Sequence, residues 1–95
     1  MEHLYVITYD ISSPKRWRVV FGIMEGYGEW LQLSVFQCRL SRTRLVQLEA
    51  ALAEAMNHNE DHVLIMDLGP AEGVEPRVRS LGKVFQPVER HAIIV

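Results

Sequence analysis

The stretch LYVITYDISSPKRWR, residues 4–18, places one carboxylate close to three bases. Asp10 ends a run of apolar, β-forming residues, and Lys15, Arg16 and Arg18 follow within eight positions. An acid in this setting can form a salt bridge, cap the following turn or ligate a metal ion. Bases beside it suit the phosphates of a nucleic acid. The surrounding elements must be predicted before one of these roles can be chosen.

Basic and acidic residues are segregated along the chain, although the formal net charge is only −2. No Lys or Arg occurs between residues 45 and 76, where acids are frequent. This pattern predicts a basic face of phosphate-binding size and an acidic back, or else an accidental grouping of solvated side chains. The bases form three groups: Lys15, Arg16 and Arg18; Arg39, Arg42 and Arg44; and Arg77, Arg79, Lys83 and Arg90.

Length and composition predict one small globular domain over residues 1–95, with 48% hydrophobic residues. So much apolar surface in so short a chain favours a homodimer. The single cysteine, Cys38, excludes an internal disulfide and fits a reducing compartment. No apolar run approaches the roughly 20 residues that span a bilayer, and the start does not resemble a signal peptide. We therefore expect a cytoplasmic protein without a membrane partner.

Residues 3–9 (HLYVITY) are apolar on both faces of a strand, which predicts a central strand of a sheet. A helix is predicted over residues 12–28, with Ser13 as its cap and Pro14 in its first turn. Gly28 is predicted to end it in the left-handed conformation. Its apolar stripe at helical spacing is Trp17, Val20, Phe21 and Met24.

Residues 29–41 alternate like a strand but are too many for one strand, so a turn is predicted at 32–34. A second helix is predicted over 43–57, and a buried strand over 62–68. The order β-α-β-β-α-β predicts an α+β, ferredoxin-like sandwich with an extra C-terminal strand. Both helices would lie on one face, leaving the other for a second copy. The core seam of the second helix is Leu45, Leu48, Leu52 and Met56.

Other reactive side chains are interpreted as structural. His58 and His62 have helical spacing, but NHNEDH is rich in turn formers, so they are predicted to be exposed loop residues. Cys38 has no neighbouring His or acid arranged for nucleophilic catalysis. No phosphate-binding glycine loop, Ser-His-Asp signature or zinc spacing is present.

Several segments together are similar to the CRISPR-associated Cas2 family. They are YDIS with KRWR, GYG, QLSVFQCRLS, a leucine-rich helix and EDHVLIMDLG, in the family's order over essentially the whole chain. The resemblance implies a ferredoxin-like homodimer that works in CRISPR adaptation. Its partners would be the Cas1 integrase and a protospacer DNA duplex. Family members are also described as metal-dependent endonucleases on RNA or double-stranded DNA.

The resemblance implies that Asp10 is the metal ligand and catalytic residue. One Mg²⁺ would be shared by the Asp10 side chains of two protomers, since one carboxylate is a poor magnesium site. An acid often follows the Ser-Val-Phe stretch in this family, whereas Gln37 stands here. The predicted nucleic-acid contacts are Tyr9, Lys15, Arg16, Arg18, Ser34, Phe36, Arg39, Arg42, Arg44, Arg77 and Arg79. For Tyr9 the alternative is packing within the strand, and for Phe36 it is a place in the core or in an interface, which is the more common role of such an aromatic residue.

Two other functions fit the same fold. One is a stand-alone toxin-type ribonuclease, and the other is a non-catalytic ferredoxin-like module that binds a small ligand. The QLSVF stretch and the long tail favour the adaptation protein over the toxin. The apolar end of the chain, Ala92 to Val95, is predicted to pack on a partner chain, so deletion of residues 84–95 is expected to weaken assembly.

Overall fold

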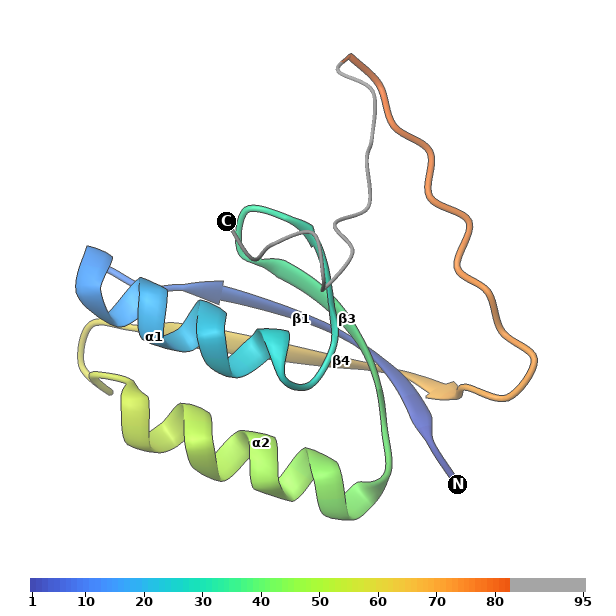
Figure 1. Ribbon diagram of the computed structural model, residues 1–95, viewed down its shortest axis with the longest axis horizontal. Helices are drawn as coiled ribbons and strands as arrows, with labels where there is room; N and C mark the ends of the chain where they lie inside the picture. The colour runs from blue at the N-terminus through green and yellow to red at the C-terminus, as the bar shows by residue number, and fades with distance from the viewer. Residues whose placement is uncertain (83–95) are drawn as a thin grey trace.

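The computed structural model describes residues 1–82, which form four strands and two helices. Their order is β1 (His3–Asp10), α1 (Pro14–Glu25), β2 (Glu29–Gln32), β3 (Val35–Leu40), α2 (Arg42–Ala55) and β4 (His62–Pro70). The strands form one sheet in the order β2-β3-β1-β4, with every neighbouring pair antiparallel (Figure 1). This is the predicted ferredoxin-like arrangement, with β1 in the interior of the sheet. Neither helix within residues 1–82 is long and apolar enough to cross a membrane.

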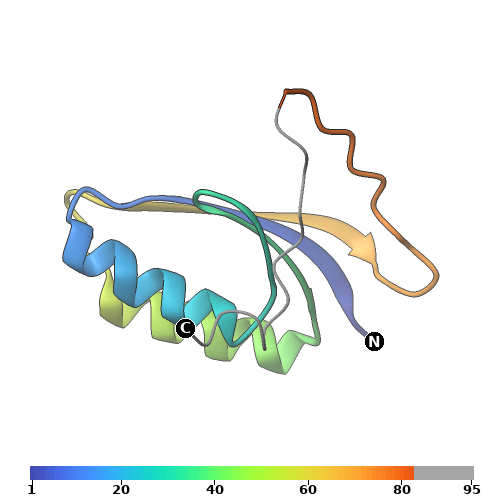
Figure 2. The same cartoon turned by 45° about the horizontal axis from the view of Figure 1, so that its top comes forward.

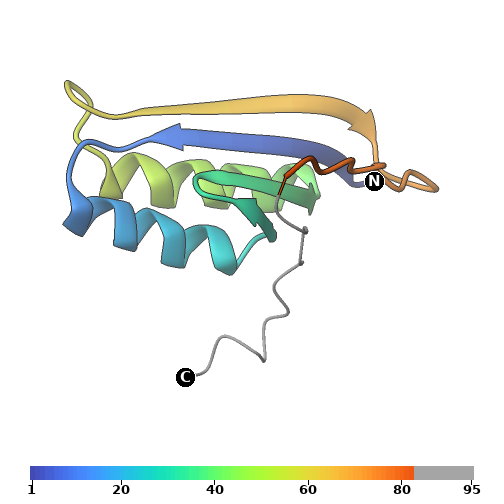
Figure 3. The same cartoon turned by 90° about the horizontal axis from the view of Figure 1, so that it is seen from above.

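Both helices lie on one face of the sheet, and the core lies between the two layers (Figure 3). Ile7, Phe36, Val20 and Leu48 are fully buried there, so β1, β3 and both helices contribute to one core. The predicted stripes are confirmed, because Val20, Met24, Leu48 and Leu52 are buried and the other members pack against them.

The start of α1 is as predicted, but its end is not. The Ser13 hydroxyl accepts a hydrogen bond from the Arg16 backbone at 3.3 Å, and Pro14 opens the helix. The helix ends at Glu25, and Gly26 caps it in a right-handed conformation. Gly28 therefore does not end the helix. It is needed for close approach, since a Cβ at this position would lie 2.5 Å from the Gln37 carbonyl oxygen.

The long alternating stretch 29–41 divides into β2 and β3 at a tight turn, as predicted. Leu33 adopts a left-handed conformation with φ of 39° and is exposed. The Trp30 indole donates a hydrogen bond of 2.8 Å to the Leu33 carbonyl and so closes the turn. Because a non-glycine residue occupies the left-handed position, the usual turn signal was missing from the sequence.

β4 is an edge strand, not the buried strand that its apolar sequence predicted. Val63 and Ile65 pack against the core, but Leu64, Met66 and Leu68 are 50%, 43% and 59% exposed. The reason is the layer architecture, because neither α1 nor α2, the two helices of residues 1–82, covers the outer face of the sheet (Figure 2). The protomer thus presents an apolar row on that face, which we call the open face.

The chain leaves the sheet after β4 without a further strand up to residue 82. Ala71 is buried, its backbone N–H donates to the Glu2 carbonyl at 2.9 Å, and Arg39 holds the same segment. The predicted extra strand is therefore not found in residues 71–82. Its remaining part and the apolar end of the chain lie outside the described residues.

Candidate functional site

Asp10 is the last residue of β1, and its side chain is exposed. Within residues 1–82, no hydrogen bond or ion pair engages its carboxylate, and Ser13, not Asp10, caps α1. Among the described residues, Asp10 therefore forms neither the salt bridge nor the helix cap that its sequence position allowed. The carboxylate is accessible to a ligand.

Asp10 lies on the open face of the sheet. Strand residues alternate between faces, and Tyr9 is buried on the helix side. In the pairing of β1 with β4, Asp10 is opposite His62, Thr8 is opposite Leu64 and Val6 is opposite Met66. The carboxylate thus belongs to the same face as the exposed apolar row.

A single protomer offers few metal ligands around this carboxylate. In the described range 1–82, no three His, Cys, Asp or Glu side chains are grouped to hold a metal ion. An exposed carboxylate fits Mg²⁺, which prefers oxygen ligands and commonly takes one or two carboxylates with waters and phosphates. Asp10 could therefore serve as one oxygen ligand of such an ion, and the rest of the coordination would have to come from elsewhere.

Two of the predicted bases next to Asp10 are free to meet a phosphate. Lys15 and Arg18 are exposed in the first half of α1. The backbone N–H groups at this helix end add a partial positive charge. These side chains and Asp10 come from the two ends of the same short β1–α1 connection.

Arg16 has a different environment from Lys15 and Arg18. Its Nε donates to Asp61 Oδ2 at 2.8 Å, and its Nη2 donates to Glu60 Oε1 at 3.1 Å. The Arg16 hydrogen bonds, more than any other cause, lower the pKa of the Asp61 carboxyl well below its usual range despite its burial. The Asp61 hydrogen bond in turn raises the pKa of Arg16. A phosphate contact by Arg16 would have to compete with this ion pair.

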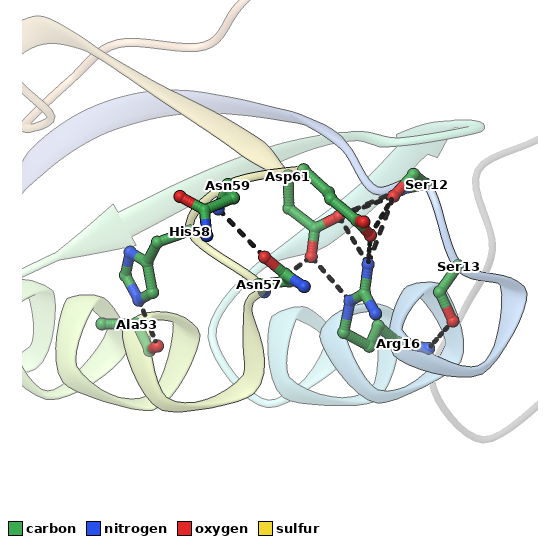
Figure 4. A network of polar contacts seen from close by, with 9 residues as sticks. Ser12, Ser13, Arg16, Ala53, Asn57, His58, Asn59 and Asp61 are labelled. Atoms are coloured by element: carbon green, nitrogen blue, oxygen red, sulfur yellow. Dashed lines mark hydrogen bonds and ion pairs between the residues drawn. The ribbon is translucent and has the colours of Figure 1, made fainter.

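Asp61 is the residue that sequence reasoning missed (Figure 4). It belongs to the turn-rich stretch NHNEDH, whose histidines are predicted to be exposed, yet its own side chain is fully buried. It accepts hydrogen bonds from the Asn57 backbone at 2.8 Å and from the Ser12 backbone at 3.1 Å. An acid directly before an apolar strand, with a basic residue at a helix start elsewhere, was the only signal available. His58 and His62 are exposed as predicted, but only His58 lies in the connection, because His62 is the first residue of β4. The His58 ring donates to the Ala53 carbonyl.

The aromatic residues predicted to contact nucleic acid are inside the protein. Phe36 is 0% exposed and Tyr9 is 6% exposed, and their rings stack with centroids 6.3 Å apart. Phe36 thus packs in the core, which was the alternative for this residue, and its ring cannot contact a base unless the core opens. Ser34 is also engaged, accepting a 2.8 Å hydrogen bond from the Trp17 indole.

The Tyr9 hydroxyl is buried and has no hydrogen-bond partner among residues 1–82. Burial raises its pKa to about 12, and the nearby Ser34 hydroxyl opposes this shift without forming a hydrogen bond of normal geometry. A phosphate cannot reach this hydroxyl unless the core opens, so Tyr9 has the packing role that was the alternative for this residue.

The remaining predicted arginines do not gather around Asp10. Arg39 donates to the carbonyls of Ala71 and Val74, so a phosphate contact by Arg39 would have to compete with these hydrogen bonds. Arg44 donates to the Gly26 carbonyl at 3.2 Å and stacks over the Tyr27 ring at 4.1 Å. Arg42 and Arg44 lie at the start of α2, directly after β3. The last residue of β3, Leu40, pairs with His3, which is at the opposite end of β1 from Asp10. The exposed members of the set are Arg42, Arg44, Arg77 and Arg79.

The sequence of residues 3–72 matches the family described as CRISPR associated protein Cas2. The chain belongs to this family. It is similar along its full length to the CRISPR-associated endoribonuclease Cas2 of Geobacter sulfurreducens, with 61% identity over 95 residues and 100% of each chain covered. The CRISPR-associated endoribonuclease Cas2 1 of Rhodospirillum rubrum is 54% identical over 94 residues, covering 99% of this chain and 92% of that one.

Solved structures share the fold. The Streptococcus pyogenes Cas2 structure at pH 6.5 superposes with a TM-score of 0.72 at 28% identity, covering 83% of this chain and 99% of that one. A Thermus thermophilus protein described as hypothetical gives a TM-score of 0.74 at 28% identity, covering 93% and 100%. The family resemblance expected from YDIS, KRWR and QLSVF is confirmed.

Proposed function

We propose that this Cas2-family chain is a CRISPR adaptation protein that also cleaves phosphodiesters in RNA or double-stranded DNA with a divalent metal. Family membership supports the CRISPR role, and the names of its two relatives as endoribonucleases support the nuclease activity. The work of such a protein with chromosomal and invading nucleic acid fits a cytoplasmic location.

The observation that carries the proposal is the exposed Asp10 carboxylate at the end of the central strand, on the same face as Val6, Leu64 and Met66. A second copy that covered this apolar face would remove it from water and bring two open faces together. A two-fold axis near the ends of the two β1 strands would then pair the two Asp10 carboxylates. In this proposal, burial of the open face forms the homodimer, and the same contact brings together the two carboxylates of the catalytic site.

The paired carboxylates would hold one Mg²⁺ between them. Without a cation, two adjacent carboxylates repel each other and one tends to keep a proton. When bound, Mg²⁺ polarises a phosphodiester and lowers the pKa of a bound water. The chain's own contribution is to place the two carboxylates, and cleavage is expected to increase with pH as they ionise.

Lys15 and Arg18 would hold the substrate backbone. Both are exposed near the start of α1, whose N-terminal N–H groups also favour an anion. In the dimer they would occur twice, on either side of the paired aspartates. A duplex held this way would be presented to the Cas1 integrase, which we propose as the protein partner.

Cleavage assays on the Asp10 variants test this function. Labelled duplex DNA and single-stranded RNA are incubated with wild type, Asp10→Ala or the isosteric Asp10→Asn, with Mg²⁺ or EDTA, across pH. We expect cleavage to require Mg²⁺ and to fall by at least about 100-fold in both variants, as for loss of a metal ligand. Duplex binding is expected to persist in both. Cleavage by Asp10→Asn at the wild-type rate would refute the metal role, and a wild type that binds but never cleaves would leave only the scaffold.

A further inference from the structure

We infer that Asp61 is a positioning residue for Asp10, acting through Arg16 and the β1–α1 connection. This inference rests on the proposed function, because it concerns how the Asp10 carboxylate is held for metal-dependent cleavage. Asp61 does not touch the substrate in this scheme. It determines where the residues that do so are placed.

Five hydrogen bonds converge on the Asp61 carboxylate, and they come from three separate places in the chain. Oδ1 accepts from the Ser12 backbone at 3.1 Å, the Ser12 hydroxyl at 3.3 Å and Arg16 Nη2 at 3.1 Å. Oδ2 accepts from Arg16 Nε at 2.8 Å and from the Asn57 backbone at 2.8 Å. The carboxylate therefore ties the β1–α1 connection, the first turn of α1 and the α2–β4 connection together (Figure 4).

The hydrogen bonds of Asp61 hold two segments next to Asp10, one on its own strand and one on the neighbouring strand. On its own strand, Asp10 is two residues before Ser12, whose backbone N–H and hydroxyl are both held by Asp61. On the neighbouring strand, Asp61 directly precedes His62, the residue opposite Asp10 in the β1–β4 pairing. Loss of the carboxylate would release the chain just after Asp10 and the end of its pairing strand at once.

A carboxylate is required because every surrounding group is a donor. Asparagine has almost the same shape, but its NH₂ group would face one of the N–H groups that now donate to Asp61. Arg16 would also lose the charge that pairs with it. A carboxylate that must hold a shared metal tolerates little displacement, and a shift of about 1 Å can cost about 100-fold in rate.

The same chain supplies a matched control at the other end of the sheet. Asp67 on β4 accepts a 2.9 Å hydrogen bond from His3 on β1 and a 2.8 Å bond from the Gly69 backbone. It is also an aspartate that joins β4 to β1, but His3 and Asp10 lie at opposite ends of β1. Asp67→Asn therefore removes a cross-strand carboxylate far from Asp10, although the Asp67 side chain is 52% exposed and that of Asp61 is buried.

The experiment compares Asp61→Asn, Arg16→Lys, their combination, Asp10→Ala and Asp67→Asn in the full-length dimer. Each is assayed for kcat, KM and the Mg²⁺ concentration that gives half-maximal rate, at a temperature where circular dichroism shows it folded. We expect Asp61→Asn to lower kcat about 10- to 100-fold, to raise the half-maximal Mg²⁺ concentration about 10-fold and to change KM less than about 3-fold. The kcat of the double variant should be no lower than that of the less active single variant, because the two residues act through one contact. The kcat of Asp67→Asn should stay within about 2-fold of wild type.

The outcomes separate this inference from the proposed function. If Asp10→Ala is inactive but folded Asp61→Asn and Arg16→Lys match wild type in kcat and Mg²⁺ dependence, Asp61 is only structural and the inference fails alone. If Asp10→Ala cleaves normally, or wild type does not cleave, the proposed function fails and the inference with it. Should Asp61→Asn not fold, Arg16→Lys carries the test, because it keeps the charge but loses the two-nitrogen contact with Asp61.

Discussion

Tyr9 and Asp10 are neighbours on β1, yet their side chains have opposite surroundings. Tyr9 is 6% exposed on the helix side, and Asp10 is exposed on the open face. The alternation of a strand makes this separation unavoidable. Of the two adjacent polar groups that the motif supplies, only the carboxylate is available for chemistry in this structure.

Replacement of Tyr9 by Phe tests this assignment. The Tyr9 hydroxyl is buried without a hydrogen-bond partner in the described chain, so its removal leaves no group unpaired. We expect Tyr9→Phe to raise the free energy of unfolding by about 0.5–1 kcal/mol in urea titrations, because an unsatisfied buried hydroxyl is costly. Cleavage is expected to be unchanged. A large loss of cleavage with intact stability would show that Tyr9 leaves the core to act on the substrate.

Alkaline pH is expected to destabilise the fold through Cys38 and Tyr9. Burial raises the pKa of each to about 12, from ordinary values of 9.0 and 10.0. Between about pH 9 and 12 the unfolded chain releases these protons while the folded chain keeps them, so stability falls as pH rises. The measurement is the free energy of unfolding from pH 7 to 11 for wild type and for Cys38→Ala with Tyr9→Phe. The double variant should show a shallower decline, and equal slopes would contradict the assignment.

Gly28 shows how one residue fixes the packing of an element. It lies between α1 and β2, against the Gln37 carbonyl and the Cys38 side chain of β3. We expect Gly28→Ala to destabilise the protein by about 1–3 kcal/mol, because the new methyl group would force β3 away.

Gly22 supplies the control for this change. It is in the interior of α1, and nothing would lie within 4 Å of an added Cβ. Gly22→Ala should therefore stabilise the protein, by about 0.5–1 kcal/mol, through helix propensity. Thermal denaturation of both variants measures the contrast. Equal effects of the two substitutions would contradict the close approach at Gly28.

At the scale of elements, local signals in the sequence were sufficient where contacts are local. Ser13, Pro14 and the stripe including Val20 correctly predicted the start and the buried face of α1. The exposure of β4 could not be read in the same way. Its residues are as apolar as those of β1, and only the position of β4 at the edge of a one-sided sheet distinguishes them.

In the candidate site, too, the features set by local sequence could be predicted and those set by tertiary contacts could not. The strand end at Asp10 and the exposed Lys15 and Arg18 could be predicted from sequence and family resemblance. The pairing of Arg16 with Asp61 could not, because it joins residues 45 positions apart through a tertiary contact. The sequence allowed Phe36 either a core position or contact with a base, and the packing of β3 against both helices decides for the core.

At the scale of the whole molecule, the open face is the expected site of self-association. Met66 lies on this face and Val46 lies on α2 in the helix layer, and they are 43% and 56% exposed. We expect Met66→Asp to shift the protein from dimer to monomer in sedimentation experiments, because it places a charge in the apolar contact. Val46→Asp, an equally polar change at a similar exposure, should leave the dimer intact. Dissociation by both variants, or by neither, would place the contact elsewhere.

The burial of Cys38 also makes the chain convenient for distance measurements between copies. It is the only cysteine in the sequence, it is 1% exposed, and with a pKa of about 12 almost none of it is thiolate at neutral pH. Maleimides and nitroxide labels react with accessible thiolates and should therefore leave it unmodified. A cysteine introduced at Val46, which is 56% exposed on α2 and lies away from the open face, would be labelled selectively, without prior removal of the native thiol. Spin labels attached there would report the distance between two copies if the proposed dimer forms.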